Sequence, residues 1–349
     1  GTHHGLTLEG DADAPGSAED AAVVYTSAMA GTPLGARLTH ANLLSNARAT
    51  VEAGAMTTDD HALVVLPFSH LFGLVVSGAA PLVAGARVTT MARFNPIKAI
   101  ELLEAEPVSV LVGVPAVFAG LVALLSRRQA GLRSEHLRLC ICGGAPLSIE
   151  VQARWHDATG VELRQGYGLT EAGPVCLFNR VSLANRRGTL GVPFPGVRVA
   201  IRAEQTPAEV PDETEGEICV AGPNVFAGYL NVGEVPPNEP WRAGLARAGE
   251  WLRTGDRGVR HADGTFSFRG VIKPMFTRNG FNIYPREIER VVTRMAGVRA
   301  VRVQPVSDPM RENDIALEVA GDVTPDDVKS WCETNLAAYK RPSTIRIEQ

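Results

Sequence analysis

Hydrophobic and polar positions follow different rhythms in successive parts of the chain, and each rhythm predicts a different kind of structure. From residue 21 to about Gly168, short apolar runs alternate with stripes in which apolar residues recur every three or four positions. Residues 108–114 and 137–142 predict buried strands, and residues 117–125 predict a helix. This alternation predicts an α/β fold: a mostly parallel sheet covered by helices, which holds ligands at the carboxyl ends of its strands.

Helix ends in this first part are marked by their capping residues. Asn95 is a suitable N-cap, and Pro96 fits the first turn of the helix that follows it. Ser148 is a second N-cap candidate, and Gly160 is suited to end that helix. The apolar window 62–86 is interrupted by prolines and glycines, so it predicts a buried strand, turn and helix, and no membrane span is expected.

The pattern changes after about residue 188. Short β-branched runs between glycine, proline and Asp-Gly turns predict a small antiparallel β-barrel or sandwich over about 188–270. A helix beginning at Pro285, alternating strands and a last helix after Thr324 predict a compact α+β module. We therefore expect a flexible lead-in (1–20), a large domain (21–273) and a small C-terminal α+β domain (274–349).

Composition narrows the class of protein. The chain has 349 residues, long enough for two or more domains, and 45% of them are hydrophobic. A net charge of −4 and scattered Lys and Arg residues predict no nucleic-acid partner. Five cysteines in mostly apolar runs predict buried thiols in a cytoplasmic protein. Cys140 and Cys142 are spaced as a metal pair would be, but the sequence offers no second pair to complete four ligands.

Three short motifs carry side chains suited to chemistry. The segment Gln165–Glu171 has the sequence Gln-Gly-Tyr-Gly-Leu-Thr-Glu, which places an aromatic ring, a hydroxyl and a carboxylate after a predicted strand. Arg253–Asp256 is Arg-Thr-Gly-Asp, and Gly280–Glu289 begins with Gly-Phe-Asn. Taken singly, the motifs also suit a glycine-rich βα turn with a helix-capping Thr-Glu pair, a hairpin turn and the start of an amphipathic helix.

In this order and spacing, the motifs resemble those of the adenylate-forming (AMP-binding) superfamily, in its acyl-CoA synthetase or fatty-acid–CoA ligase branch. The resemblance extends from about Ala21 to Pro342. It implies a ligase that activates a small-molecule carboxylic acid, fatty or aliphatic, with an aryl acid left open. The acid forms an acyl-adenylate with ATP, and the thiol of coenzyme A or of an acyl carrier protein then takes the acyl group. ATP, Mg²⁺ and coenzyme A are the implied cofactors.

The resemblance also implies roles for individual residues. Tyr167 corresponds to the residue that stacks on adenine, and Asp256 to the carboxylate that binds both ribose hydroxyls. Thr170 corresponds to an α-phosphate ligand and Glu171 to the Mg²⁺ ligand, and with His70 they are the implied catalytic residues. The nucleotide-binding positions implied in this way are Thr26, Ser27, Gly31, Gly144, Ala145, Gln165, Gly166, Tyr167, Gly168 and Asp256.

Further positions concern the acyl group and the thiol. The acyl-pocket positions implied by the resemblance are His70, Gly143, Gly144 and Gly168. A histidine in an apolar run also suits a buried core residue, and the Gly143–Pro146 loop also suits a plain βα turn. Lys273 corresponds to the hinge of the small domain. Gly280, Phe281 and Asn282 correspond to the tunnel for the pantetheine of coenzyme A.

The phosphate loop departs from the family pattern. In the family it runs Ser/Thr-Gly-Ser/Thr-Ser/Thr-Gly-x-Pro-Lys-Gly, and here Ser27–Gly35 is Ser-Ala-Met-Ala-Gly-Thr-Pro-Leu-Gly. Ala28 removes a flexible glycine, Met29 and Ala30 remove hydroxyl donors, and Leu34 removes an ammonium group. The alternative function is therefore a catalytically silent nucleotide- or acyl-adenylate-binding homologue.

Other departures concern the ribose site and the two ends. Val271 stands where the family has an arginine near the ribose, and few residues precede the phosphate loop. Because family members also continue beyond the Tyr339–Pro342 segment, we expect the chain to be truncated at both ends. A Rossmann-type oxidoreductase is disfavoured because no Gly-x-Gly-x-x-Gly follows a first strand.

Overall fold

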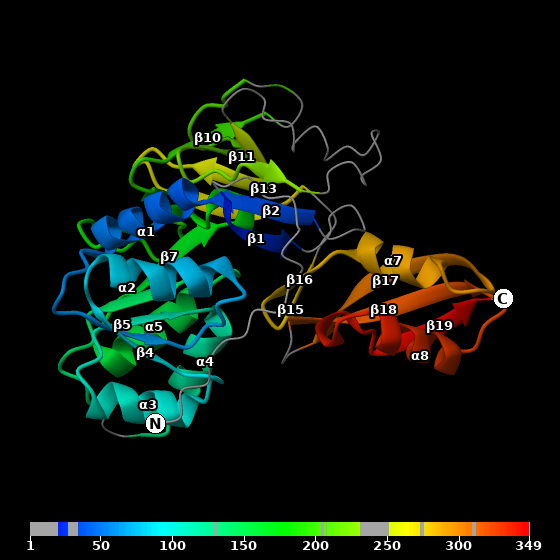
Figure 1. Cartoon of the computed structure of the whole chain (residues 1–349), viewed down its shortest axis with the longest axis horizontal. Helices are drawn as coiled ribbons and strands as arrows, with labels where there is room; N and C mark the ends of the chain where they lie inside the picture. Colours follow the sequence, from blue (N-terminus) through cyan, green and yellow to red (C-terminus); the bar gives the residue numbers. More distant parts are fainter. Residues whose placement is uncertain are drawn as a thin grey trace.

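A seven-stranded sheet is the centre of the first part of the chain (Figure 1). The computed structural model describes residues 20–26, 34–128, 131–203, 206, 208–230, 251–272, 276–308 and 312–348, without the side chains of Asn282 and Arg286. In spatial order the strands are β4 (Arg87–Thr90), β3 (His61–Val64), β5 (Val110–Gly113), β6 (Leu139–Cys142), β7 (Leu163–Gly168), β8 (Val175–Phe178) and β9 (Val192–Pro193). Strands β4 to β7 are parallel, whereas β8 and β9 are antiparallel. The predicted α/β sheet is confirmed.

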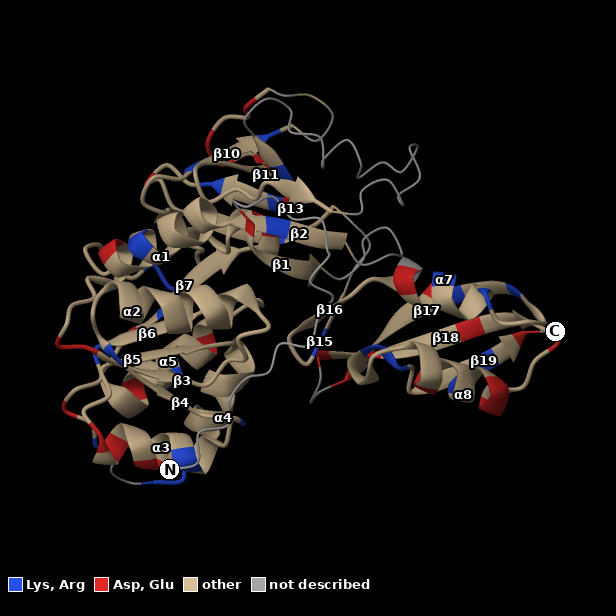
Figure 2. Cartoon of the chain, in the orientation of Figure 1, with Lys and Arg blue, Asp and Glu red and all other residues tan. Residues whose placement is uncertain are grey.

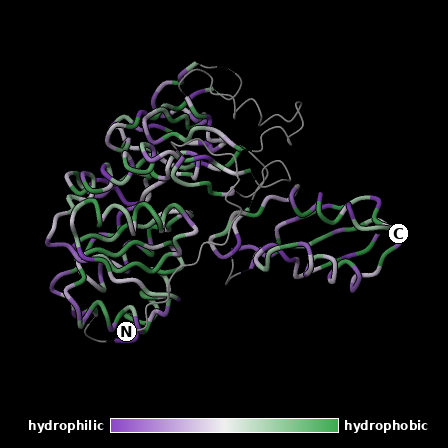
Figure 3. The backbone as a smooth tube through the Cα atoms, viewed as in Figure 1, coloured by the Kyte–Doolittle hydropathy of each residue, from purple (hydrophilic) through white to green (hydrophobic). Residues whose placement is uncertain are grey.

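Helices cover both faces of this sheet, and alternate strand residues face opposite layers. Val110 and Val112 of β5 pack in one core with α1 (His40–Gly54), whereas Leu111 packs in the other. The second core also contains residues from α3 (Pro96–Ala105), α4 (Pro115–Leu125) and α5 (Ile149–Thr159). Hydrophobic segments therefore gather between the layers (Figure 3), as expected for strands buried on both faces.

The predicted helix ends are confirmed. The Asn95 side chain accepts hydrogen bonds from the backbone N–H groups of Ile97 and Lys98, and Pro96 is the first residue of α3. Ser148 caps α5, which ends at Gly160. These local contacts satisfy backbone donors that have no partner within the helix. They therefore fix the residue at which each helix starts.

The apolar window 62–86 contains an irregular helix. After β3 the chain forms a π-helix, η1 (Phe72–Ala79), which continues into α2 (Ala80–Val83). The predicted strand, turn and helix are present, but the wide π geometry was not predicted. In the part of the chain that the structure describes, no helix combines the length and apolar character required to cross a membrane.

Antiparallel strands make up the next part of the chain. In spatial order they are β10 (Arg198–Arg202), β11 (Glu215–Ala221), β13 (Leu252–Arg260) and β14 (Phe266–Val271). The antiparallel character predicted for this region is confirmed, and the strand order is that of an open sheet. A separate sheet joins β1 (Asp20–Thr26), β2 (Leu34–Thr39) and β12 (Gly228–Tyr229).

The C-terminal part has its own hydrophobic core and lies to one side of the other sheets (Figure 1). It begins with the hairpin β15 (Phe276–Arg278) and β16 (Phe281–Ile283). Its remaining elements are α7 (Pro285–Thr293), β17 (Val298–Asp308), β18 (Glu312–Gly321), α8 (Pro325–Asn335) and β19 (Thr344–Glu348). The predicted α+β character is confirmed, whereas the boundary near Lys273 lies outside the described residues and remains a prediction.

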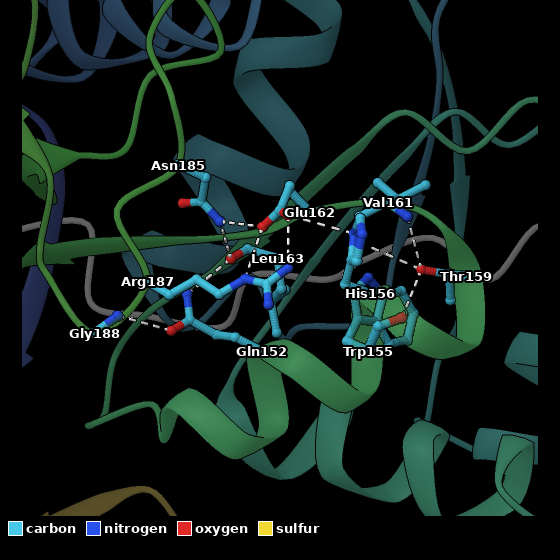
Figure 4. Close-up of polar contacts among 10 residues, drawn as sticks. All are labelled: Gln152, Trp155, His156, Thr159, Val161, Glu162, Leu163, Asn185, Arg187 and Gly188. Atoms are coloured by element: carbon cyan, nitrogen blue, oxygen red, sulfur yellow. Dashed lines mark hydrogen bonds and ion pairs between the residues drawn. The ribbon is translucent and has the colours of Figure 1, made fainter.

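A polar network ties the start of β7 to the loop that precedes β9 (Figure 4). Gln152, which is fully buried, accepts a hydrogen bond from Gly188 N (3.0 Å) and donates one to Leu163 O (3.0 Å). The Arg187 guanidinium binds Glu162, with 2.7 Å between Nη2 and Oε1, and holds the pKa of that carboxyl below its usual range. The network fixes the strand that carries Tyr167.

A second polar network lies at the amino-terminal ends of the neighbouring strands β3, β5 and β6. Asp60 Oδ1 accepts hydrogen bonds from Ser109 Oγ (2.6 Å) and Arg138 Nε (2.8 Å). The adjacent His61 ring is buried, and its Nε2 lies 2.8 Å from Thr89 Oγ1. Burial, with the positive charge of Arg87, lowers the pKa of His61, although the negative charge of Glu106 acts in the opposite sense.

Acid is therefore expected to weaken the fold through His61. Its pKa in the folded chain lies below the ordinary 6.5, so below pH 6.5 the unfolded chain binds more protons and the free energy of unfolding falls. Urea unfolding at pH 7.5 and 5.5 measures this loss, which should be smaller in His61→Gln than in the unmodified chain. His136→Gln, at an exposed position, is the control. Equal losses in all three proteins would contradict the assignment.

Charged residues of both signs lie on many elements of the described part of the chain (Figure 2), and the cysteines are buried. Lys and Arg alternate with Asp and Glu over both parts (Figure 2). The five cysteines are free and buried, as predicted. Burial raises the pKa of the Cys219 thiol to about 12 and that of Cys332 to about 11, so both thiols stay protonated near neutral pH.

Candidate functional site

A cavity of about 670 Å³ lies where the loops after the parallel strands meet the antiparallel sheets. It receives the loop after β6, the end of β7 with the turn that follows, and the Asp256 region of β13. The residues that the sequence predicted for the site and that line this cavity are Thr26, His70, Gly143, Gly144, Ala145, Gln165, Gly166, Tyr167, Gly168, Thr170, Glu171 and Asp256. The structure thus brings side chains from distant motifs to one cavity.

Other predicted positions lie elsewhere. Ser27, Gly31 and Lys273 lie outside the described residues. Gly280 and Phe281 belong to the β15–β16 hairpin and do not line the cavity, and of Asn282 only the backbone is described. The exposed Phe281 ring nevertheless stacks on Tyr339, with 4.7 Å between ring centroids, and Tyr339 does line the cavity.

Tyr167 and Asp256 are in direct contact although they lie on different sheets. The Tyr167 hydroxyl donates a hydrogen bond to Asp256 Oδ2 over 2.6 Å. Burial and the negative charge of Asp256 raise the pKa of Tyr167 well above its usual range, so the hydroxyl remains a donor at neutral pH. The contact orients the tyrosine ring in the cavity and fixes one oxygen of the carboxylate.

The Arg-Thr-Gly-Asp motif explains how Asp256 is held. Arg253 Nε donates to Glu217 Oε2 (2.7 Å), and Gly255 N donates to Glu217 Oε1 (2.8 Å). Thr254 Oγ1 donates to Ile218 O (2.8 Å). At Gly255 the backbone turns with φ of +74°, a conformation that side chains disfavour. The first three motif residues therefore anchor β13 to β11. They hold the fourth residue, Asp256, in place on the cavity wall.

The Thr170–Glu171 turn is held by buried asparagines. Asn46 donates to Val175 O (2.9 Å), and Asn224 donates to Ala172 O (2.7 Å). Both asparagines are almost completely buried, so these bonds form in a low-dielectric interior. Neither asparagine was predicted from sequence, because each binds a carbonyl group more than 50 positions away and no local pattern indicates such a contact.

The turn after β7 also requires a glycine at position 168. A Cβ atom there would lie 1.9 Å from Pro174 O, far inside contact distance. Leu169 N donates to that same carbonyl over 3.0 Å, so the two sides of the turn are closely apposed. Gly168 thus allows the turn that places Thr170 and Glu171 on the cavity wall.

His70 reaches the cavity from the segment that precedes the π-helix. Its ring is accessible to solvent, yet the surrounding protein desolvates it and lowers its pKa, which favours neutral imidazole at neutral pH. The adjacent Phe72 packs against the glycine loop: a Cβ on Gly143 would lie 3.2 Å from Phe72 Cζ. An imidazole therefore lies beside the apolar part of the cavity.

Several cavity residues were not singled out from sequence. Tyr229 of β12 donates a hydrogen bond to Glu171 Oε1 and lines the cavity. Tyr284 and Asn313 of the C-terminal part also line it. Tyr284 belongs to the Gly280–Glu289 motif, but no role was assigned to it. No motif indicates Tyr229 or Asn313, because each reaches the site through strands distant in sequence.

Leu34, at the position where the family pattern has lysine, is the first residue of β2. It is buried, lines the cavity and pairs with Thr26 across the β1–β2 ladder. The structure therefore puts an aliphatic side chain at this part of the cavity wall.

The surroundings of Glu171 fit a magnesium ion that is bound together with a nucleotide. Within the described part of the chain, no group of three or more His, Cys, Asp or Glu side chains is arranged to hold a metal ion. Magnesium is commonly held by one or two carboxylates together with substrate phosphates and water. Glu171, on the cavity wall beside Thr170, fits this arrangement when a nucleotide supplies the other oxygens.

The parallel sheet and the cavity at its carboxyl edge define an α/β protein with a ligand cleft at its strand ends. The family described as AMP-binding enzyme matches residues 4–230. This chain belongs to that family.

Relatives and solved structures agree with this assignment. The chain is 35% identical over 332 residues to a feruloyl-CoA synthase of Amycolatopsis sp, covering 93% of this chain and 65% of the relative. It is 30% identical over 339 residues to a long-chain-fatty-acid–CoA ligase of Bacillus subtilis (strain 168), covering 94% and 58%. The structure is similar to a malonyl-CoA ligase with methylmalonyl-CoA and AMP bound, at a TM-score of 0.81 and 29% identity, covering 99% and 73%. The chain thus spans about two thirds or less of the two sequence relatives.

Proposed function

We propose that the protein is an ATP-dependent acid–thiol ligase that forms an acyl-adenylate and then an acyl thioester. The observation that carries this proposal is the 2.6 Å hydrogen bond between Tyr167 and Asp256 on the cavity that Glu171 also lines. The Tyr167 ring suits the base of a nucleotide, and the Asp256 carboxylate suits two vicinal hydroxyls of its sugar. The Glu171 carboxylate suits the magnesium ion that accompanies its phosphates.

Each residue has a distinct role in this proposal. Tyr167 stacks on adenine against the glycine loop that contains Gly144 and Ala145, and Asp256 accepts hydrogen bonds from both ribose hydroxyls. The Thr170 hydroxyl binds the α-phosphate. When magnesium is bound at Glu171, its charge offsets the repulsion between the phosphates and the attacking carboxylate.

The first half-reaction requires positioning rather than a general base. The acid is already ionised at neutral pH. One of its oxygens attacks the α-phosphorus, the bond from that phosphorus to the bridging oxygen breaks, and pyrophosphate leaves. Holding the two anions in line within the cavity supplies much of the rate.

The acyl group is proposed to be apolar. Apolar side chains that line the cavity are Leu71, Phe72, Val76, Ile141, Phe178, Leu190 and Phe194. Among the described lining residues, Arg253 is the only Lys or Arg, and it is paired with Glu217. Such a wall favours a fatty, aliphatic or aryl acid over an acid that carries a second charge. Neutral His70 and Gly143 lie at the same wall.

The second half-reaction transfers the acyl group to sulfur. A thiolate of coenzyme A or of a carrier protein attacks the acyl carbon, AMP leaves, and the thiol proton passes to solvent. We assign the approach of the thiol to Gly280, Phe281 and Asn282. The stack of Phe281 on the cavity residue Tyr339 supports this route.

The proposal includes two domains and a cytoplasmic location. Residues 21–273 form the AMP-binding domain, and residues 274–349 form a small domain that turns about Lys273. Separate hydrophobic cores support this division. Five free, buried cysteines support a reducing compartment.

A second candidate function is a silent homologue that binds nucleotide or acyl-adenylate without forming it. The burial of Leu34 at the cavity wall favours this candidate, because an ammonium group is replaced by an aliphatic one. Pyrophosphate loses a charge-assisted hydrogen bond there, a cost of about 1.5–3 kcal/mol.

Pyrophosphate exchange against a panel of fatty, aryl and dicarboxylic acids separates the candidates. A ligase exchanges label into ATP with an apolar acid and not with malonate. In parallel, the chain is supplied with preformed acyl-adenylate and coenzyme A. Because the altered phosphate loop concerns pyrophosphate alone, we expect thioester formation to exceed adenylation. Equal impairment of both half-reactions, relative to a full-length relative, would contradict that expectation.

A further inference from the structure

Tyr229 lies in a short segment that contacts Glu171 twice. Phe226 N donates to Glu171 O (2.9 Å), and the Tyr229 hydroxyl donates to Glu171 Oε1. The Phe226 and Tyr229 rings also pack edge to face, with 4.7 Å between centroids. Both the backbone and the side chain of Glu171 are therefore fixed by residues about 55 positions further along the chain.

The same segment is attached to the hairpin that contains the phosphate loop. Strand β12 pairs with β2, where Tyr229 lies opposite Ala36, and Leu230 N donates to Gly35 O (2.9 Å). The Thr26 hydroxyl, at the other end of the loop, also contacts Tyr229. Tyr229 thus lies between the first residue before the phosphate loop and the carboxylate of Glu171.

We propose that Tyr229 is a positioning residue that orients Glu171 toward magnesium and couples this carboxylate to the phosphate-loop hairpin. The inference rests on the proposed function of Glu171. One carboxylate oxygen, Oε1, is fixed by the Tyr229 hydroxyl. Within the described part of the chain the other oxygen, Oε2, has no hydrogen-bond partner. Glu171 lines the cavity, and fixing its rotamer lowers the entropy lost when a cation binds there.

The tyrosine hydroxyl is a donor near neutral pH, which is the form that this role requires. The aromatic ring also fills the space between Phe226 and the cavity. Replacing Tyr229 with phenylalanine keeps that packing and removes only the donor.

The test measures metal binding directly, on the whole chain in the presence of ATP. Mn²⁺ replaces Mg²⁺, and free Mn²⁺ is followed by electron paramagnetic resonance. Tyr229→Phe is expected to weaken Mn²⁺ binding by about tenfold or more, since a hydrogen bond to a charged group is lost. Ser126→Ala, which removes a hydroxyl at an exposed position that does not line the cavity, is the control and should bind Mn²⁺ as the unmodified chain does.

A double-mutant cycle with Glu171→Gln separates positioning from general packing. If Tyr229 acts through the Glu171 carboxylate, Tyr229→Phe has no further effect on Mn²⁺ affinity in the Glu171→Gln background. An equal loss in both backgrounds assigns Tyr229 to the fold and overturns the inference. Normal Mn²⁺ affinity in Tyr229→Phe, with weak binding in Glu171→Gln, also overturns it while the proposed function stands. A chain that binds no Mn²⁺ with ATP overturns both.

Discussion

Asp256→Ala is expected to lower the affinity of the chain for a non-hydrolysable acyl-adenylate mimic by about 100-fold or more, because two hydrogen bonds to a charged group are lost at about 1.5–3 kcal/mol each. The substitution also leaves the buried Tyr167 hydroxyl without the acceptor that it contacts at 2.6 Å. The tyrosine ring then loses its fixed orientation toward the base. Titration calorimetry with the mimic measures the effect.

Two companion variants show whether the loss belongs to the ribose site. Tyr167→Phe keeps the ring and removes only the contact to Asp256, so its loss should be smaller. Asp263→Asn changes a carboxylate in the turn between β13 and β14, which does not line the cavity, and should bind the mimic normally. Unchanged affinity in Asp256→Ala would refute the nucleotide site, since the proposal depends on that carboxylate.

Local chemistry explains how much of the fold was predictable from sequence. The caps at Asn95 and Ser148 act on backbone groups two or three residues away, so their effect is encoded within one turn. Apolar runs such as 137–142 contain the β6 strand because a strand buried on both faces excludes polar residues. The carboxyl ends of parallel strands lie at one edge of a sheet. The sequence therefore predicted that the glycine loop after β6 lies beside Tyr167 at the end of β7.

The unpredicted features depend on tertiary structure. Tyr229 reaches Glu171 only because β12 joins the β1–β2 hairpin, and no period in the sequence indicates a two-residue strand. Asn46 and Asn224 are ordinary polar residues in sequence, yet both are buried where the turn after β7 leaves carbonyl groups to satisfy. The π-helix Phe72–Ala79 has the apolar composition of a buried α-helix, so composition alone does not distinguish them.

Motif resemblance and structure contribute differently to the candidate site. The resemblance suggested the chemical roles proposed for Tyr167, Glu171 and Asp256, and the structure supplied their common cavity and the direct contact between two of them. The contact also changes the expected geometry, because Oδ2 of Asp256 already accepts one hydrogen bond. A carboxylate oxygen has two lone pairs, so the ribose hydroxyls still have acceptor sites.

Restoring the phosphate loop is expected to give the largest gain in affinity for ATP. The variant combines Ala28→Gly, Met29→Ser, Ala30→Thr and Leu34→Lys, which returns the family pattern at the positions that depart from it. Three regained polar contacts to pyrophosphate, at about 1.5–3 kcal/mol each, raise ATP affinity by at least about 100-fold even when they are far from additive. Calorimetry with Mg·ATP and pyrophosphate exchange measure the gain.

The acyl-adenylate mimic is the internal control for this variant, because it lacks the β- and γ-phosphates. Its affinity should stay constant while that of ATP rises, and a parallel rise in both would show that the loop acts on overall stability instead.

Leu34→Lys alone tests whether an ammonium group at this position binds the phosphates of ATP. Leu34 is 3% exposed, so an unpaired ammonium group there is costly. We therefore expect this single variant to melt at a lower temperature without nucleotide and to recover with ATP, whereas Leu34→Met should show neither effect. If the restored chain forms acyl-adenylate and the unmodified chain does not, the altered loop is the cause of the missing activity. If neither chain does, the cause lies in residues beyond the loop.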